Sequence, residues 1–168
     1  MADPLVPLSV VEVRLAVPAG PGVEAGMVVL AESAGLYRQL RIVIGRAEAA
    51  AINSAWRGEV PARPSTWDLF VSTVAVLDGR FTTATITAVE ERRHWFAALD
   101  LERGDLRRAV SCRPSDAIAV ALRSPGTALV APEGVMALGG VLPDGSLPPP
   151  TPAAAAPGGG PDESISFT

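Results

Sequence analysis

Two short segments of the sequence share one order of residues, Arg-Pro-Ser followed closely by an acid. The first spans residues 63–68 (RPSTWD) and the second spans residues 113–116 (RPSD). Residues of this kind commonly begin a helix, and the open N–H groups of a helix start attract anions. The arginine before each proline adds a guanidinium group that matches the geometry of a phosphate. Each segment therefore predicts a helix start that can bind an anion.

We expect the two segments to meet in one polar site, where they combine into a site for phosphodiester chemistry. Arg63 and Arg113 would then bind phosphate oxygens. Asp68 and Asp116 would hold Mg²⁺ or Mn²⁺, an ion that activates water. Glu48, in the first turn of another predicted helix, is a candidate third carboxylate. These residue types predict metal-assisted hydrolysis by carboxylates and arginines, with no organic cofactor.

The same residues also have a purely structural interpretation. A serine at the N-cap accepts a hydrogen bond from a free helix N–H, and an acid in the first turn complements the helix dipole. Ser65 and Asp68 have the spacing of a reciprocal cap, and Ser115 with Asp116 would cap the second helix. Glu48 has the same alternative at its own helix start. The residues alone leave both interpretations open.

Composition narrows the class of protein. The 168 residues are 48% hydrophobic, carry a net charge of −4 and include one cysteine. No apolar run reaches the roughly 20 residues that span a bilayer, and no signal peptide is recognisable. We therefore expect a soluble cytoplasmic protein without membrane association. Gly-rich phosphate loops and Cys/His metal spacings are missing, and the one histidine, His94, is expected to be a solvated turn residue.

Hydrophobic spacing predicts the elements that position these residues. Alternating or β-branched runs predict strands at 8–17, 27–31, 40–44, 80–89, 95–101, 106–111 and 128–131. Helical spacing predicts helices at 46–56, 66–77 and 115–123, with one further helical turn at 133–137. Residues 90–93 are expected to form a charged hairpin loop.

The order of these elements predicts an α+β fold. Strands and hairpins interrupted by about three helices favour a mixed, largely antiparallel sheet with the helices packed against it. We expect a single domain at residues 1–142. Residues 143–168 are rich in Pro, Gly and Ala and are expected to form a disordered tail, whose partner the sequence does not specify.

The chain resembles the bifunctional nuclease (BFN) domain family. The resemblance covers roughly residues 10–136 and is carried by residues 27–30, 40–52 (LRIVIGRAEAAAI), 63–69 (RPSTWDL) and 113–122 (RPSDAIAVAL). It implies hydrolysis of RNA and DNA by an α+β domain that associates into homo-oligomers. Matched by position, the polar residues that it implies are Glu48, Arg63, Asp68, Arg113, Ser115 and Asp116.

One departure from the family bears on catalysis. The family commonly has Thr-His-Asp where this chain has Thr66, Trp67 and Asp68. A general base or metal ligand at the histidine position would be missing here, although Trp67 offers a face on which a nucleic-acid base stacks. The leading hypothesis is a nuclease-like phosphodiesterase acting on RNA, DNA or both. The alternative is a non-catalytic oligomeric module that binds a small anion, a nucleotide or a protein partner.

Overall fold

The computed structural model describes residues 3–89 and 94–145. The expected loop at 90–93, and all but the first three residues of the expected tail, lie outside these ranges. The described strands are β1 Leu5–Gly20, β2 Val23–Glu32, β3 Gln39–Ile44, β4 Arg80–Val89, β5 His94–Arg103, β6 Leu106–Cys112 and β7 Ala128–Pro132. The described helices are α1 Arg46–Trp56, α2 Thr66–Val76, α3 Pro114–Ala121 and α4 Glu133–Gly139.

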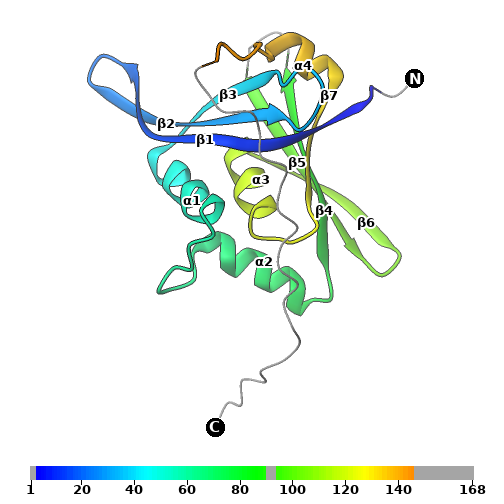
Figure 1. Cartoon of the computed structure of the whole chain (residues 1–168). Coiled ribbons are helices and arrows are strands. Elements are labelled where there is room, and N and C mark those ends of the chain that lie inside the picture. The colour runs from blue at the N-terminus through cyan, green and yellow to red at the C-terminus, as the bar shows by residue number, and fades with distance from the viewer. Residues whose placement is uncertain (1–2, 90–93, 146–168) are drawn as a thin grey trace.

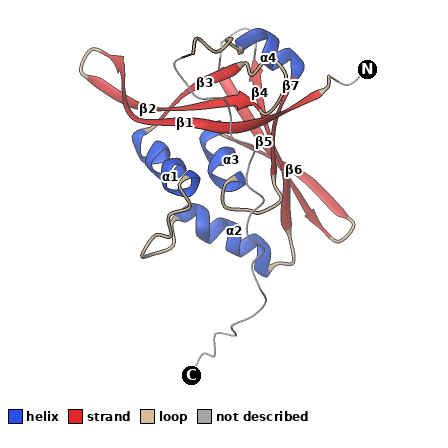
Figure 2. Cartoon of the chain, in the orientation of Figure 1, coloured by secondary structure: helices blue, strands red, loops and turns tan. Residues whose placement is uncertain are grey.

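The strands form one mixed sheet in the order β3-β2-β1-β7-β4-β5-β6 (Figure 2). Neighbouring strands are antiparallel except for β4 and β7, which run parallel. Strand β1 joins the two halves of the sheet, because its first residues pair with β7 and the rest pair with β2. The predicted α+β class with a largely antiparallel sheet is confirmed.

Helices α1 and α3 cover one face of the sheet and bury the main core (Figure 1). Ile52 of α1 and Ile118 of α3 are fully buried, as are Leu30 and Ile86 from the two halves of the sheet. Burying a side chain of this size removes about 1.5–3 kcal/mol of unfavourable hydration. The start of α1 lies especially close to β2, since a Cβ atom on Gly26 would overlap the methyl group of Ala49.

The helix boundaries differ from the prediction at α2, which ends at Val76 rather than at residue 77, and at α3, which ends at Ala121 rather than at residue 123. The start of α3 differs as well. This helix begins at Pro114 rather than at Ser115, because proline suits the first helical position, where its missing N–H is not needed. The further helical turn predicted after β7 is a helix of seven residues, α4. Within residues 3–89 and 94–145, no helix is long and apolar enough to cross a membrane.

Candidate functional site

The second Arg-Pro-Ser segment lies where β6 ends and α3 begins. Arg113 is the N-cap residue, and its carbonyl accepts the first hydrogen bonds of the helix, from the N–H groups of Asp116 and Ala117. Ser115 is therefore inside the helix and is not the predicted cap, a correction that follows from the start at Pro114. The segment does begin a helix, as predicted, but the arginine occupies the capping position.

The Arg113 guanidinium joins two carboxylates from different helices. Its Nε and Nη2 atoms donate to the two oxygens of Asp116 at 2.9 and 3.0 Å. Its Nη1 atom donates to Oε1 of Glu48 at 2.9 Å, which connects the start of α3 to the start of α1. Hydrogen bonding to Asp116, followed by the negative charge of Asp116 and then Glu48, raises the pKa of Arg113.

Arg113 still has free hydrogen-bonding capacity. A guanidinium carries five N–H groups, and the three bonds to Asp116 and Glu48 leave one on each Nη atom. The side chain is 65% exposed. Each of these two N–H groups can donate to an anion, so Arg113 can contact a phosphate without releasing either carboxylate.

The absence of a side chain on Gly45 leaves room for the Glu48 carboxylate at the start of α1. One carboxylate oxygen of Glu48 lies where a side chain on Gly45 would be, so a Cβ at that position would overlap it. Among residues 3–89 and 94–145, Oε2 of Glu48 makes no hydrogen bond, whereas Oε1 is bonded to Arg113. The Glu48 side chain is 19% exposed, so this second oxygen offers an acceptor in a sheltered position.

Arg113 and Glu48 line a hollow of about 480 Å³ between the ends of four elements, whereas Asp116 contacts Arg113 from outside this lining. Residues from β3, α1, β5 and α3 line it: Arg41, Ile42, Val43, Ile44, Gly45, Glu48, His94, Trp95, Arg113, Pro114 and Ser115. The hollow has room for a nucleotide-sized group and presents both aromatic and charged side chains.

The first Arg-Pro-Ser segment has a different role. Ser65 caps α2 and forms the predicted reciprocal cap with Asp68, whose carboxylate accepts the Ser65 N–H at 2.7 Å. The other Asp68 oxygen accepts from Nε of Arg123 at 3.0 Å. Arg123 is 10% exposed and also donates to the carbonyl oxygens of Ala119 and Ala51. Through Arg123, Asp68 therefore links α2 to α3 and α1.

The acids of the two segments have different arginine partners in the structure, Arg123 for Asp68 and Arg113 for Asp116. Asp116 is in the first turn of α3, whereas the partner of Asp68, Arg123, follows the last turn. The backbone positions of Asp116 and Arg123 are seven residues apart, about 10 Å at the rise of a helix, and the Arg123 guanidinium reaches back one turn to the carbonyl oxygen of Ala119. Each acid binds its own arginine, so the acid that accompanies Asp116 is Glu48 rather than Asp68.

Two further predicted site residues, Trp67 and Arg63, also lie apart from the hollow. The Trp67 ring packs against the core and lies 5.8 Å beneath the guanidinium carbon of Arg123. Arg63 is exposed in the connector before α2 and makes no ion pair within the described ranges. The substitution of the family's histidine by Trp67 therefore removes no group from the hollow.

Sequence reasoning did not assign Arg41, His94 or Trp95 to the site, although all three line the hollow. His94, expected to be a solvated turn residue, is the exposed first residue of β5 and lines the hollow with Trp95 and Arg41. No local pattern marks them, because sheet pairing and helix packing bring them to the site. In the described part of the chain, no three His, Cys, Asp or Glu side chains gather as a metal-binding group.

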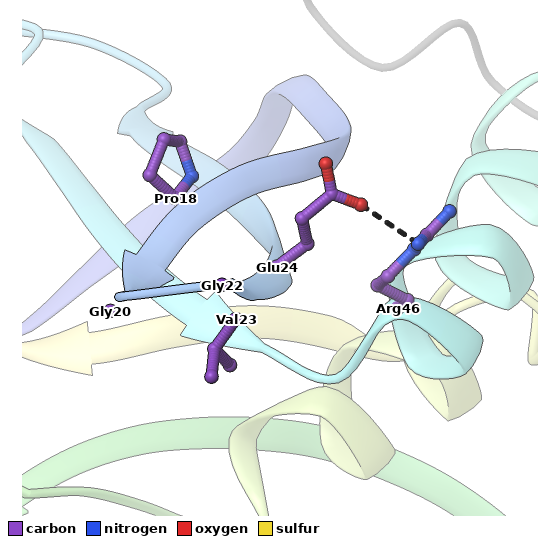
Figure 3. A pocket seen from close by; sticks show the side chains of 6 residues that line it. All are labelled: Pro18, Gly20, Gly22, Val23, Glu24 and Arg46. Carbon is purple, nitrogen blue, oxygen red and sulfur yellow. Dashed lines mark hydrogen bonds and ion pairs between the residues drawn. The ribbon is translucent and has the colours of Figure 1, made fainter.

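A second hollow, of about 510 Å³, lies at the turn between β1 and β2. Figure 3 shows Arg46 reaching toward Glu24 beside it, with the two side chains joined by an ion pair of 2.9 Å. Both side chains are 60% exposed, and exposed pairs of this kind contribute little to stability. Fewer polar groups converge here than in the hollow beside Arg113, which remains the better candidate site.

Comparison with known proteins agrees with the resemblance. A family model described as the bifunctional nuclease domain matches residues 28–141. Two proteins of Mycobacterium tuberculosis, the uncharacterized proteins MT1877 (strain CDC 1551 / Oshkosh) and Rv1829 (strain ATCC 25618 / H37Rv), are each 38% identical over 115 residues. Each alignment covers 68% of this chain and 67% of the relative. The matched range of the family model includes both Arg-Pro-Ser segments and every residue that lines the hollow.

Proposed function

Because the chain belongs to the bifunctional nuclease domain family, we propose that it hydrolyses phosphodiester bonds of RNA or DNA in the hollow beside Arg113. The observation that carries this proposal is the position of Arg113 at the start of α3, where it holds two carboxylates and keeps two N–H groups for a phosphate. The helix start adds its own partial positive charge on the same side.

Phosphate binding is the first part of the proposed reaction. The two remaining N–H groups of Arg113 donate to phosphate oxygens, as the guanidinium fork does in other phosphate sites. Asp116 binds Nε and Nη2 of the same guanidinium, so it fixes the orientation of the Arg113 side chain. Ser115 lines the hollow beside Arg113 and supplies a further hydroxyl for the bound group.

The carboxylates fit a divalent cation shared with the substrate. Mg²⁺ is usually bound through one or two carboxylates together with phosphate oxygens and water, so a group of three protein ligands is not required. Glu48 and Asp116 would hold the ion, in place of the pair Asp68 and Asp116 expected from the sequence, and the free Oε2 atom of Glu48 is the acceptor in the best position. Mg²⁺ or Mn²⁺ would supply a water of lowered pKa and neutralise charge on the phosphate.

Two other side chains of the hollow suit a nucleic-acid substrate. Trp95 is half-buried and lines the hollow, where the face of its indole ring can stack on a base. His94 lies at the exposed start of β5, and an imidazole in that position can exchange a proton with water or with the leaving oxygen. Single-stranded RNA or DNA presents its bases for such stacking, whereas duplex DNA does not.

A cleavage assay tests the proposal. End-labelled single-stranded RNA and DNA are incubated with the full chain in Mg²⁺, in Mn²⁺ and in EDTA. We expect cleavage with either ion, loss of cleavage in EDTA, and a decrease of at least about tenfold in Arg113→Gln and Glu48→Gln. Glu59→Gln, which changes an exposed acid outside the hollow, is the matched control. Cleavage that survives Arg113→Gln overturns the site, and cleavage that survives EDTA overturns the role of the ion.

The paired state of Arg113 favours a second candidate function. Two carboxylates accompany Arg113, and Arg41 adds a second positive charge to the lining, so these four side chains carry no net charge toward an entering phosphate. A non-catalytic module that binds a small anion or nucleotide with modest affinity is consistent with that balance. It predicts thermal stabilisation by phosphate or a nucleotide without turnover. An unchanged melting temperature across these ligands, together with cleavage of RNA, would eliminate it.

A further inference from the structure

Arg41 of β3 is a second arginine that lines the hollow. Arg41 and Val43 are exposed and line it, whereas the side chain of Ile42 between them is buried in the core. This alternation follows from the pleat of a strand, which turns successive side chains to opposite faces. Strand β3 is an outer strand of the sheet, and this position leaves the Arg41 side chain 42% exposed.

Arg41 is held more weakly than Arg113. Its Nη2 atom lies 3.5 Å from Oδ2 of Asp144, and within residues 3–89 and 94–145 the Arg41 guanidinium forms no hydrogen bond. Arg113, in contrast, donates three hydrogen bonds of 2.9–3.0 Å to two carboxylates. An exposed ion pair such as that of Arg41 contributes little free energy. The Arg41 guanidinium can therefore exchange its carboxylate for another anion at low cost.

The segment after α4 places Asp144 beside Arg41. Val141 and Gln39 exchange two backbone hydrogen bonds of 2.8 and 2.9 Å, which attach the chain to the outer edge of β3. Figure 1 shows this segment, in orange, beside β3. Asp144 follows three residues after Val141, and it lies beyond residues 28–141, the range that the family model matches. The contact between Asp144 and Arg41 is therefore a feature of this chain outside the matched range.

Asp144 changes the charge that an entering phosphate meets. The two arginines balance the charges of Glu48 and Asp116. Asp144 adds one negative charge while it contacts Arg41. A phosphate that replaces this carboxylate on Arg41 gains charge-assisted hydrogen bonds from a guanidinium that had none with Asp144. The exchange therefore favours a phosphate that already has a second point of attachment in the hollow.

We propose that Arg41 binds a second phosphate of the nucleic acid, next to the phosphate on Arg113, and that this phosphate replaces the carboxylate of Asp144. The inference rests on the proposed function, because it takes the phosphate site at Arg113 as its starting point. Two phosphates on two arginines bracket one nucleoside, whose base then lies in the hollow, where Trp95 can stack on it. The hollow therefore selects a strand with at least two phosphates over a mononucleotide, and Asp144 lowers the affinity for any ligand that uses Arg41.

Binding measured without cleavage tests the role of Arg41. Calorimetric titration in EDTA compares thymidine 5′-monophosphate, which has one phosphate, with the 5′-phosphorylated thymidine dinucleotide, which has two. We expect the unmodified chain to bind the dinucleotide at least about threefold more tightly, and Arg41→Gln to remove this preference with unchanged circular dichroism. Arg14→Gln is the matched control, because Arg14 is 50% exposed, pairs with Glu12 and does not line the hollow. Equal affinities for the two ligands, no binding, or a preference that survives Arg41→Gln overturns the proposal.

A double-mutant cycle tests the competition with Asp144. Asp144→Asn should raise the affinity for the dinucleotide by about two- to fivefold, because the carboxylate no longer competes for Arg41. The same change made in Arg41→Gln should have little effect, since the guanidinium for which the two anions compete is gone. Asp105→Asn, at an exposed acid in the turn between β5 and β6, is the control for net charge. An unchanged affinity in Asp144→Asn, an equal gain in Asp105→Asn, or a full gain in the Arg41→Gln background overturns the competition.

These measurements separate the inference from the proposed hydrolysis. Cleavage of single-stranded RNA, together with unchanged dinucleotide binding in Arg41→Gln, overturns the inference alone. Binding of the dinucleotide that depends on Arg41, without cleavage of any strand, supports the inference and contradicts the hydrolysis, because calorimetry in EDTA requires no turnover.

Discussion

Replacing Asp68 by Asn separates the structural role of this acid from the catalytic role that the sequence suggested. The carboxylate accepts from the Ser65 N–H at 2.7 Å and from Nε of Arg123 at 3.0 Å. Hydrogen bonds to charged groups contribute about 1.5–3 kcal/mol each, and Asn keeps one acceptor for the cap. Arg123 also retains the carbonyl oxygens of Ala119 and Ala51. We therefore expect a loss of about 2 kcal/mol of unfolding free energy at pH 7.

The loss of unfolding free energy in Asp68→Asn should become smaller at low pH. Hydrogen bonding from Ser65, with a further contribution from Arg123, lowers the pKa of Asp68 below its ordinary value of 3.8. A group whose pKa is lower in the folded state stabilises the fold above its unfolded pKa, and this contribution is lost as the pH falls through the folded value. The difference between the unmodified chain and Asp68→Asn should therefore be constant from pH 7 to 5 and shrink below about pH 4.

Urea unfolding followed by circular dichroism measures the difference. All variants are compared at one protein concentration, because dimerisation would make the midpoint depend on concentration. Glu59→Gln is the control, since the side chain of Glu59 is exposed and makes no hydrogen bond within the described ranges. A difference below about 0.5 kcal/mol at pH 7, the usual range for surface substitutions, would refute the assignment of Asp68 to structure. A difference that grows as the pH falls would refute it too.

Three further substitutions or reactions test other parts of the structure. Gly26→Ala should destabilise the fold by about 1–3 kcal/mol in urea, because the new methyl group overlaps Ala49 where α1 meets β2. Trp67→His, which restores the family's residue, should lower the melting temperature without raising the rate of RNA cleavage, because Trp67 packs beneath Arg123 and does not line the hollow. Burial raises the pKa of the Cys112 thiol, so iodoacetamide at pH 8 should modify it slowly in the native chain and quickly in urea.

Local patterns predicted the elements of the fold well. The helix predicted at residues 46–56 and the strand predicted at residues 80–89 have the predicted limits in the structure. Alternation in β1 and helical spacing in α2 identified the type of each element from a short window of sequence. They did not identify every buried side chain, because Leu15, Leu69 and Leu77 are exposed. The start of α3 was missed by one residue because proline was interpreted as an approach to the helix rather than as its first residue.

The candidate site was only partly predictable. Arg113, Asp116 and Glu48 were identified from their types and from the helix starts that they occupy. Their arrangement was not, because the sheet order and the packing of α1 on α3 decide which helix starts meet. For the same reason, nothing near Asp68 in the sequence indicates that its partner is Arg123, which is 55 residues away. The second Arg-Pro-Ser segment therefore contributes to the candidate site, whereas the acid of the first segment links α2 to Arg123.

Asp116 is assigned to the candidate site and Asp68 to the stability of the fold. The most direct test of these assignments compares Asp116→Asn with Asp68→Asn in the same assay. Initial rates of cleavage of one labelled single-stranded RNA in Mg²⁺ are normalised to the folded fraction of each protein. We predict that Asp116→Asn loses at least about tenfold in rate, because Asp116 orients the guanidinium that binds phosphate. Asp68→Asn should keep its rate within about twofold, since Asp68 has no role in the transition state. Equal losses in the two variants, a larger loss in Asp68→Asn, or no cleavage by the unmodified chain would contradict the account.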